Sequence, residues 1–210
     1  MTSETPASPG IAQWDQRFAG EDYLFGETPN AFLVRQKFRL PPSGLALAVA
    51  DGEGRNGVWL AGQGLATVSV DGSAVAQTKA RRLAAARGVE LDLRLVDLTR
   101  WDWPEGAFDV VAGIFIQFAG PELRDRLFAG MAQALRPGGL LLIEGYGPRQ
   151  LNYRTGGPST LENLYTTDLL AAAFPGFEIL ELRDHDAEIA EGAGHHGLSH
   201  LVDLVARKPT

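Results

Sequence analysis

Strand and helix patterns alternate through the middle of the chain. Short apolar runs and apolar-polar alternation predict strands, whereas apolar residues three and four positions apart predict helices. The strands are expected at residues 45–50, 67–73, 91–98, 108–118 and 140–146, and two of the helices between them at 73–88 and 121–135. Strands that alternate with helices form a mostly parallel sheet, because each helical crossover returns the chain in the same direction.

The two ends of the chain depart from this alternation. Helical spacing predicts two helices within residues 11–40, interrupted at GETPN, and we expect this aromatic-rich segment to be a lid over a ligand pocket. Residues 159–174 are expected to form one helix, followed by strands at 177–190 and 199–208 that are joined by EGAGHHGL. Because no helix separates these last strands, they are expected to pair antiparallel at the sheet edge.

The predicted fold class is α/β. We expect a doubly wound, Rossmann-like sheet of seven strands, mostly parallel, with an antiparallel strand near the C-terminus, helices on both faces and an N-terminal helical lid. Residues 1–10 are small and polar and are expected to be a flexible tail, and residues 11–210 one domain.

The composition of the chain indicates which classes of binding partner this domain can have. The chain has 45% hydrophobic residues and a formal net charge of −7, which supports a globular core and disfavours a nucleic-acid partner because phosphates would be repelled. It contains no cysteine, so disulfides and cysteine metal sites are excluded. We find no apolar run of membrane length and no leader pattern, and we expect a cytoplasmic protein, monomeric or homodimeric, that does not bind membranes.

A glycine loop follows the first predicted strand. Gly52, Gly54 and Gly57 satisfy the G-x-G-x-x-G pattern, in which the backbone turns tightly and the next helix directs free N–H groups at a ligand. The second predicted strand ends in Asp71, roughly 20 residues later, where a carboxylate can accept from both hydroxyls of a ribose. The two signals together predict a ligand of the adenosine type, and the alternative for Asp71 is a simple helix N-cap.

These features, with VDL at Asp97, FDVV, LRPGG and the final strand pair, resemble the class I S-adenosylmethionine-dependent methyltransferases. The runs WDQRF, GEGRN and TGGP are most similar to the small-molecule branch that includes tellurite and thiopurine methyltransferases. The resemblance implies S-adenosyl-L-methionine as cofactor and a small-molecule methyl acceptor. It also implies the cofactor-binding residues, which are Ala50, Asp51, Gly52, Gly54, Asp71, Gly72, Asp97, Leu98, Gly113 and Ile114.

The chain departs from the family pattern in the glycine loop. The family has an acidic residue in the first strand and then three alternating glycines, where this chain has Ala48 and then Ala50 in place of the first glycine. The resemblance implies that Asp51 or Glu53 replaces the missing acid at the cofactor's amino group, and whether the alanine weakens cofactor binding stays open.

Methyl transfer is an in-line displacement that depends on alignment, so a general base is optional. Tyr146, Tyr153, His195 and His196 are the candidates for a general base by residue type, and the first three, with Tyr23, are also expected in the acceptor pocket. Each also has a structural reading, since a histidine in GAGHHG can be a solvated turn residue. No carboxylate lies at ligand spacing from the adjacent histidines, so no metal site is predicted.

Arginines near the same loops could meet an anionic acceptor through paired N–H donors, and Arg149 and Arg154 are the candidates. Two other functions share the glycine loop and Asp71. One is a nicotinamide-dependent oxidoreductase, which the absence of a Tyr-x-x-x-Lys pair disfavours. The other is a non-catalytic S-adenosylmethionine-binding protein, which the alanine at position 50 favours.

Overall fold

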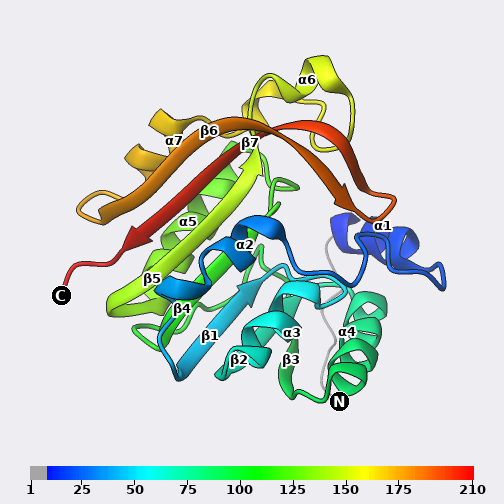
Figure 1. Ribbon diagram of the computed structural model, residues 1–210, viewed down its shortest axis with the longest axis horizontal. Coiled ribbons are helices and arrows are strands. Elements are labelled where there is room, and N and C mark those ends of the chain that lie inside the picture. Colours follow the sequence, from blue (N-terminus) through cyan, green and yellow to red (C-terminus); the bar gives the residue numbers. More distant parts are fainter. Residues whose placement is uncertain (1–8) are drawn as a thin grey trace.

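A seven-stranded sheet forms the centre of the molecule, in the order β3-β2-β1-β4-β5-β7-β6 (Figure 1). The computed structural model describes residues 9–210. The strands are β1 (Gly44–Val49), β2 (Leu65–Asp71), β3 (Leu91–Leu95), β4 (Phe108–Ile114), β5 (Leu135–Tyr146), β6 (Glu178–Glu191) and β7 (His195–Arg207). Neighbouring strands pair in parallel except for β7, which is antiparallel to both β5 and β6. The predicted fold class is confirmed.

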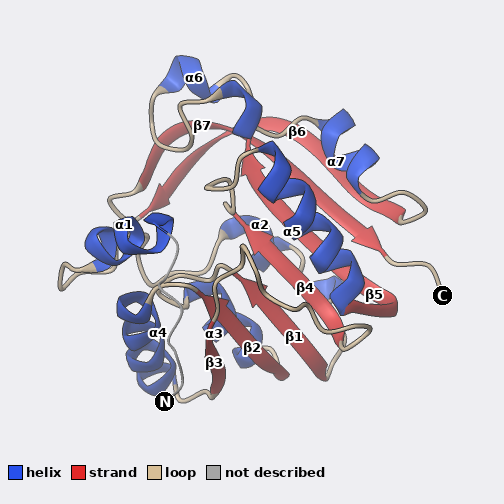
Figure 2. Ribbon diagram, turned by 180° about the vertical axis from the view of Figure 1, so that it is seen from behind, coloured by secondary structure: helices blue, strands red, loops and turns tan. Residues whose placement is uncertain are grey.

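Helices cover both faces of this sheet (Figure 2). They are α1 (Pro9–Phe18), α2 (Ala31–Arg35), α3 (Arg55–Gly62), α4 (Ala74–Arg87), α5 (Pro121–Ala134), α6 (Gln150–Tyr153) and α7 (Thr167–Ala173), with short 3-10 turns η1 (Lys37–Arg39) and η2 (Leu161–Asn163). Apolar residues of α5 and α7 pack in one core cluster, and those of α2 and α3 pack in another on the opposite face. Within residues 9–210, no helix has the length and apolar character needed to cross a membrane.

The helix α4 begins and ends where its sequence predicts. The Ser73 hydroxyl accepts from the backbone N–H of Ala76 at 3.0 Å, which satisfies a free donor of the first turn. Gly88 ends the helix with φ 66°, a left-handed conformation that costs glycine little. Asp71 is therefore not the N-cap of α4.

The single helix expected at residues 159–174 is wrong. The segment instead forms η2, an extended stretch and then α7. The backbone N–H of Tyr165 donates to the carbonyl of Tyr146 at 2.8 Å, which holds the middle of the segment against the end of β5. The Thr166 hydroxyl then caps α7 by accepting from Leu169, so the helix starts afresh there.

The prediction of a long loop at residues 191–198, between the last two strands, is also wrong. Only residues 192–194 form the turn, because β6 extends to Glu191 and β7 begins at His195. Both His195 and His196 therefore lie in a strand. Pairing with a neighbouring strand outweighs the local turn preference of the glycines around them.

The segment expected as a lid divides into two parts. Residues 31–40 pack on the sheet through Phe32 and Leu33, which are buried in the core, while Val34 and Phe38 are exposed. The helix α1 and the loop to Asn30 lie instead beside the carboxyl ends of β1 and β2 (Figure 1). The tail predicted at residues 1–10 falls largely outside the described residues, and its last two residues begin α1.

Candidate functional site

A cavity of about 640 Å³ opens at the carboxyl ends of β1, β2 and β4. This edge of an open α/β sheet, where the strand order reverses, is the usual position of a ligand site. Most residues that the sequence predicts for the cofactor line it, namely Ala50, Asp51, Gly52, Asp71, Gly72, Asp97, Leu98 and Ile114. Gly54 and Gly113 are not in the lining, because Gly54 packs on Ala80 of α4 and Gly113 on Met131 of α5.

The carboxylate of Asp71 is held by backbone amides at the edge of this cavity. Its Oδ2 accepts from the Gly52 N–H and its Oδ1 from the Ser73 N–H, both at 2.8 Å. Burial raises the pKa of Asp71 above its ordinary value, against the lowering effect of these hydrogen bonds. Since a carboxylate has about four acceptor positions, two remain for ligand hydroxyls. The geometry therefore fits the predicted contact with a ribose.

Close approach of the backbone explains two glycines of the site. Gly52 has φ 56°, and an added Cβ would lie 3.4 Å from the ring of Phe18 in α1. A Cβ on Gly72 would lie 2.8 Å from Ile11, also in α1. The two glycines thus allow the side chains of Ile11 and Phe18 in α1 to pack closely on the strand ends at the edge of the cavity.

Asp97 reaches the cavity from the end of β3 but also stabilises its own loop. Its Oδ1 accepts from the Thr99 amide at 3.0 Å and from the Thr99 hydroxyl at 2.6 Å, and it pairs with Arg100. Any contact with an adenine edge would be made beside these bonds.

The backbone of Ala50 has φ 48°, so the alanine that replaces a family glycine is in the left-handed region. A Cβ there costs about 1–2 kcal/mol. We expect Ala50→Gly to raise the free energy of unfolding by about 1 kcal/mol, measured by urea denaturation. Ala48→Gly is the matched control, because Ala48 lies in β1 and the same change should destabilise there. A lower stability for Ala50→Gly would contradict the assigned strain.

Asp51 lies beneath the glycine loop. Its carboxylate accepts from the Gly57 N–H at 3.1 Å and from the Ser69 hydroxyl at 2.8 Å. Burial raises the pKa of Asp51 from 3.8 to about 7, although these hydrogen bonds lower it. The role of Asp51 in the structure is to hold the loop in place, and a contact with the cofactor's amino group stays a prediction.

This raised pKa predicts a pH-dependent stability. Between its ordinary value of 3.8 and about 7, the folded state binds a proton that the unfolded state has lost, so the wild type loses stability as pH rises through this window. The variant Asp51→Asn should not show this loss of stability with rising pH, because an amide cannot ionise. We expect its stability relative to wild type to increase from pH 4 to pH 7 and stay constant above pH 8, by urea denaturation. A constant difference at every pH would contradict the assignment.

Glu53, the other candidate for the missing acid, forms a buried ion pair. Its Oε1 lies 2.7 Å from Lys79 Nζ, and the two side chains are 3% and 6% exposed. Lys79 also donates to the carbonyl of Asp22, and the Phe25 N–H points to Glu53 Oε2 at 3.4 Å. The pair thus anchors the loop after α1 to the glycine loop and is unavailable to a cofactor.

The other end of the cavity is aromatic. The His195 ring packs against Phe25, Phe115 and Tyr146, with centroids at 4.4, 4.5 and 5.5 Å. Phe115 has φ 55°, a left-handed conformation that places its ring beyond the end of β4. Burial lowers the pKa of His195 below its ordinary value, more than the nearby Glu191 raises it. The imidazole is consequently neutral near pH 7.

Tyr146 lines the cavity, but its chemistry does not suit a base. Its ring is 1% exposed, its hydroxyl has no partner within the described residues, and burial raises its pKa. A buried hydroxyl of this kind can donate to a bound ligand. Tyr153, in α6, is outside the cavity lining, as is Tyr23, whose hydroxyl donates to the carbonyl of Lys79.

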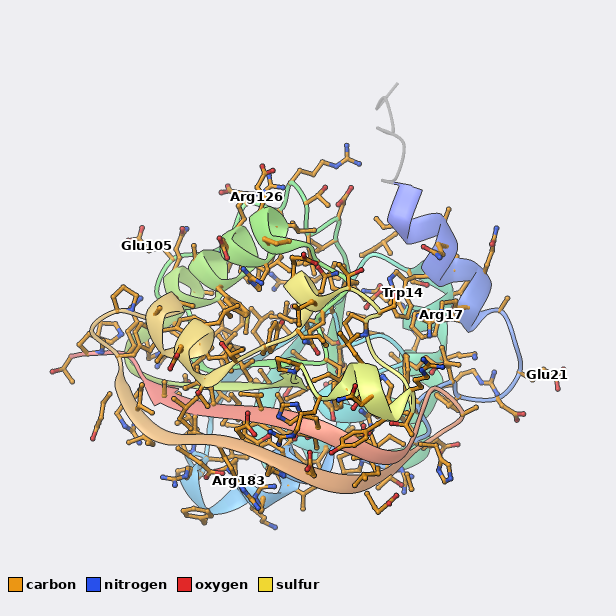
Figure 3. The ribbon with its side chains drawn as sticks, turned by 90° about the horizontal axis from the view of Figure 1, so that it is seen from above. Trp14, Arg17, Glu21, Glu105, Arg126 and Arg183 are labelled. Carbon is orange, nitrogen blue, oxygen red and sulfur yellow. The ribbon has the colours of Figure 1, made fainter. Side chains whose placement is uncertain are left out.

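The arginines expected near the acceptor lie elsewhere. Arg149 pairs with Asp184 at 2.8 Å and with Asp186 at 3.2 Å on the surface of β6, and Arg154 is the left-handed residue that ends α6. The pairing of α6 with the curved β6–β7 hairpin draws Arg149 away from the cavity. An arginine that the sequence reasoning missed, Arg17 of α1, lines the cavity and stacks 4.2 Å above the Trp14 ring (Figure 3).

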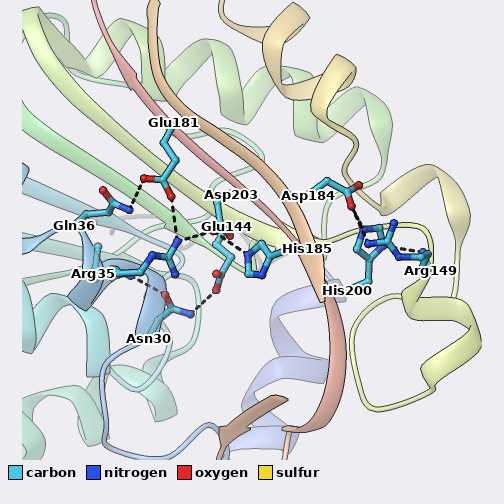
Figure 4. A network of polar contacts seen from close by, with 11 residues as sticks. Asn30, Arg35, Gln36, Glu144, Arg149, Glu181, Asp184, His185, His200 and Asp203 are labelled. Atoms are coloured by element: carbon cyan, nitrogen blue, oxygen red, sulfur yellow. Dashed lines mark hydrogen bonds and ion pairs between the residues drawn. The ribbon is translucent and has the colours of Figure 1, made fainter. Parts of the chain in front are cut away.

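A second polar cluster lies outside the cavity, between α2 and the strands β5, β6 and β7 (Figure 4). Glu144, His185 and Asp203 have ligand atoms within 4.8 Å of one another, a spacing that could hold a metal ion. Asp203 Oδ2 is 2.8 Å from an Arg35 nitrogen, and Glu144 Oε1 accepts from Asn30 at 2.5 Å. Burial and the adjacent Asp203 raise the pKa of Glu144 well above its usual range. Arg35 therefore compensates the charge of Asp203, and the raised pKa favours the protonated form of Glu144.

Comparison with known proteins agrees with this geometry. Residues 46–139 match the family model described as a methyltransferase domain. A search of the curated proteins finds no significant match.

Solved structures share the fold over nearly the whole chain. One, from work on conversion of a disulfide bond into a thioacetal group during echinomycin biosynthesis, has a TM-score of 0.78 and 18% identity over 95% of this chain and 91% of the other. The N-methyltransferase NodS from Bradyrhizobium japonicum WM9, in complex with S-adenosyl-L-homocysteine, has a TM-score of 0.73 and 12% identity over 95% and 98%. The [4+2]-cyclase SpnF has a TM-score of 0.70 and 22% identity over 98% of each chain. At these identities the likeness shows the fold.

Proposed function

We propose that the protein uses S-adenosylmethionine as its cofactor and transfers a methyl group to a small-molecule nucleophile. The match of residues 46–139 to a methyltransferase domain supports this proposal. The observation that carries the proposal is one cavity with two chemically different ends. Strand-end carboxylates and glycines lie at one end, and the aromatic residues around His195 at the other. A cofactor and an acceptor can thus meet inside a single cavity.

Each end has a defined task in this proposal. Asp71 would accept from the ribose hydroxyls, and Gly52 and Gly72 would leave room for the adenosine part. When bound, S-adenosylmethionine supplies a methyl group on a sulfonium, which is transferred in line to the acceptor. Phe115 and His195 would orient the acceptor, and most of the rate would come from this alignment.

The size and charge of the molecule support a small acceptor, as in the tellurite- and thiopurine-type branch that the sequence resembles. The net charge of −7 opposes nucleic acid, and the cavity, which Trp14 and Phe18 of α1 line on one side, has a volume of about 640 Å³ that suits a metabolite. We further propose that α1 and the loop to Asn30 are the lid of the site.

The test of cofactor binding compares two ligands. A ligand that binds only the folded state raises the free energy of unfolding, by about 2.7 kcal/mol at a ligand concentration of one hundred times its Kd. The melting temperature rises with it. We expect S-adenosylhomocysteine to raise it and NAD, the cofactor of the nicotinamide-dependent alternative, to leave it unchanged. The opposite result would refute the proposed function.

The test of the acceptor is a methyl-transfer assay with thiols, small phenols and oxyanions of selenium and tellurium, alongside bulk protein and RNA. Turnover of a small molecule would support the proposal. Labelling confined to protein or RNA would refute the small-molecule part of it.

A second candidate function is S-adenosylmethionine binding without methyl transfer. The positive φ of Ala50 favours it, because a side chain stands where the family has glycine. The similarity to SpnF, which is named as a cyclase, supports the same candidate. Binding of S-adenosylhomocysteine with no turnover across the acceptor panel would select this function.

A further inference from the structure

A carboxylate and an imidazole face each other at the aromatic end of the cavity. Glu191 ends β6, His195 begins β7, and the two residues are paired in register across the tight turn. His195 Nδ1 is 3.6 Å from Glu191 Oε2, and the side chains are 10% and 9% exposed. Nδ1 is buried and has no hydrogen-bond partner among the described residues, so that Glu191 Oε2 at 3.6 Å is a close charged neighbour just beyond hydrogen-bond distance.

Two further side chains hold Glu191 in this position. An Arg55 nitrogen donates to Glu191 Oε2 at 2.6 Å, and Asn30 Nδ2 donates to Oε1 at 3.0 Å. Arg55 is itself 7% exposed and Asn30 1%. Burial raises the pKa of Glu191, but His195 and Arg55 outweigh this effect and lower it to about 2. Glu191 is ionised throughout the physiological range.

We propose that Glu191 is a positioning residue that keeps the Nδ1 proton on His195, so that Nε2 is the general base for the acceptor. An ionised carboxylate can only accept, and a neutral imidazole that donates from Nδ1 has its lone pair on Nε2. The inference deepens the proposed function, on which it rests. It names the acceptor class as a neutral X–H nucleophile, such as a thiol or a phenol, that must lose a proton.

The chemical step balances with these groups alone. The acceptor's X–H bond breaks and its proton moves to His195 Nε2 while the X–C bond forms with the electron pair on X. The electron pair of the broken carbon–sulfur bond stays on the cofactor's sulfur. The imidazolium then returns the proton to solvent. An oxyanion is already deprotonated, so it has no proton to lose and would not need this base.

The charged and titratable groups around His195 come from several elements. Glu191 attracts its proton, whereas Arg55 of α3 and Arg17 of α1 repel it, and Tyr146 of β5 contacts the ring edge. Glu191 is the group among these that can select the tautomer, because its carboxylate is next to Nδ1.

The experiment uses the full chain with ¹⁵N-labelled histidine, with and without S-adenosylhomocysteine, and assigns His195 with the variant His195→Gln. In the wild type we expect nitrogen shifts of the Nδ1–H tautomer. In Glu191→Gln, Arg55 should engage the amide oxygen and turn the NH₂ group toward Nδ1, so we expect the Nε2–H tautomer. We also expect the His195 pKa to fall by about one unit or more, since the opposite charge is lost.

Glu188→Gln is the matched control, since Glu188 is an exposed glutamate of the same strand and should leave His195 unchanged. For methyl transfer to phenol, kcat should fall at least tenfold in Glu191→Gln, because Nε2 then carries the proton, whereas Glu188→Gln should keep the wild-type kcat. An Nε2–H tautomer in the wild type would overturn the inference. This measurement does not depend on the folding of any variant. So would an unchanged tautomer in Glu191→Gln.

Calorimetry separates this inference from the proposed function. We expect Glu191→Gln to bind S-adenosylhomocysteine within about twofold of wild type, because Glu191 lies at the acceptor end. Failure of the wild type to bind S-adenosylhomocysteine would refute the proposed function, whatever the tautomer. Binding by the wild type together with the wrong tautomer would refute only the role of Glu191.

Discussion

Replacing Lys79 with methionine is expected to lower the free energy of unfolding by about 3–5 kcal/mol, because it leaves Glu53 buried without a counter-charge. The two side chains are 6% and 3% exposed and 2.7 Å apart. Methionine has similar length, so packing is largely kept while the charge is removed. Urea denaturation at neutral pH measures the loss.

The double variant Lys79→Met, Glu53→Gln is the control for this prediction. With both charges removed, no buried ion remains unpaired, and the loss should be clearly smaller than in the single variant. A loss of less than about 1 kcal/mol in Lys79→Met would show that Glu53 finds another partner or a proton. The anchor of the loop at Asp22 and Phe25 would then need a different explanation.

Asp71→Ala is expected to weaken binding of S-adenosylhomocysteine at least tenfold, or about 1.4 kcal/mol, in calorimetry. Two hydrogen bonds from the ribose to a carboxylate would be lost, each worth roughly 1.5–3 kcal/mol. The amides of Gly52 and Ser73 would also lose their acceptor. The glycine loop would then be held less firmly.

Two variants separate these effects. Asp71→Asn keeps one oxygen acceptor and should bind more tightly than Asp71→Ala. Asp92→Ala removes a carboxylate of β3 that is exposed and pairs with Arg94, and it should leave the affinity unchanged. Unchanged affinity in Asp71→Ala would remove Asp71 from the cofactor site.

Local patterns in the sequence determine the fold and one end of the site. The spacing of apolar residues defines the alternation of strands and helices, and Ser73 and Gly88 define the ends of α4 through capping that depends only on nearby residues. The glycine loop and Asp71 follow directly from strand ends, and carboxyl ends of parallel strands meet at one edge of a sheet. The cofactor end of the cavity was therefore predictable.

The acceptor end depends on contacts between segments far apart in the chain. The pair of Glu191 with Arg55 spans 136 positions, and that of Glu191 with Asn30 spans 161. The spacing of apolar residues along the sequence does not predict contacts between residues so far apart. His195, in a sequence typical of a solvated turn, is buried only because Phe25 and Phe115 pack on its ring. The sequence by itself determined which strand ends line the cavity, and only the tertiary structure decided which side chains surround its aromatic end, because those side chains are brought together by packing rather than by local pattern.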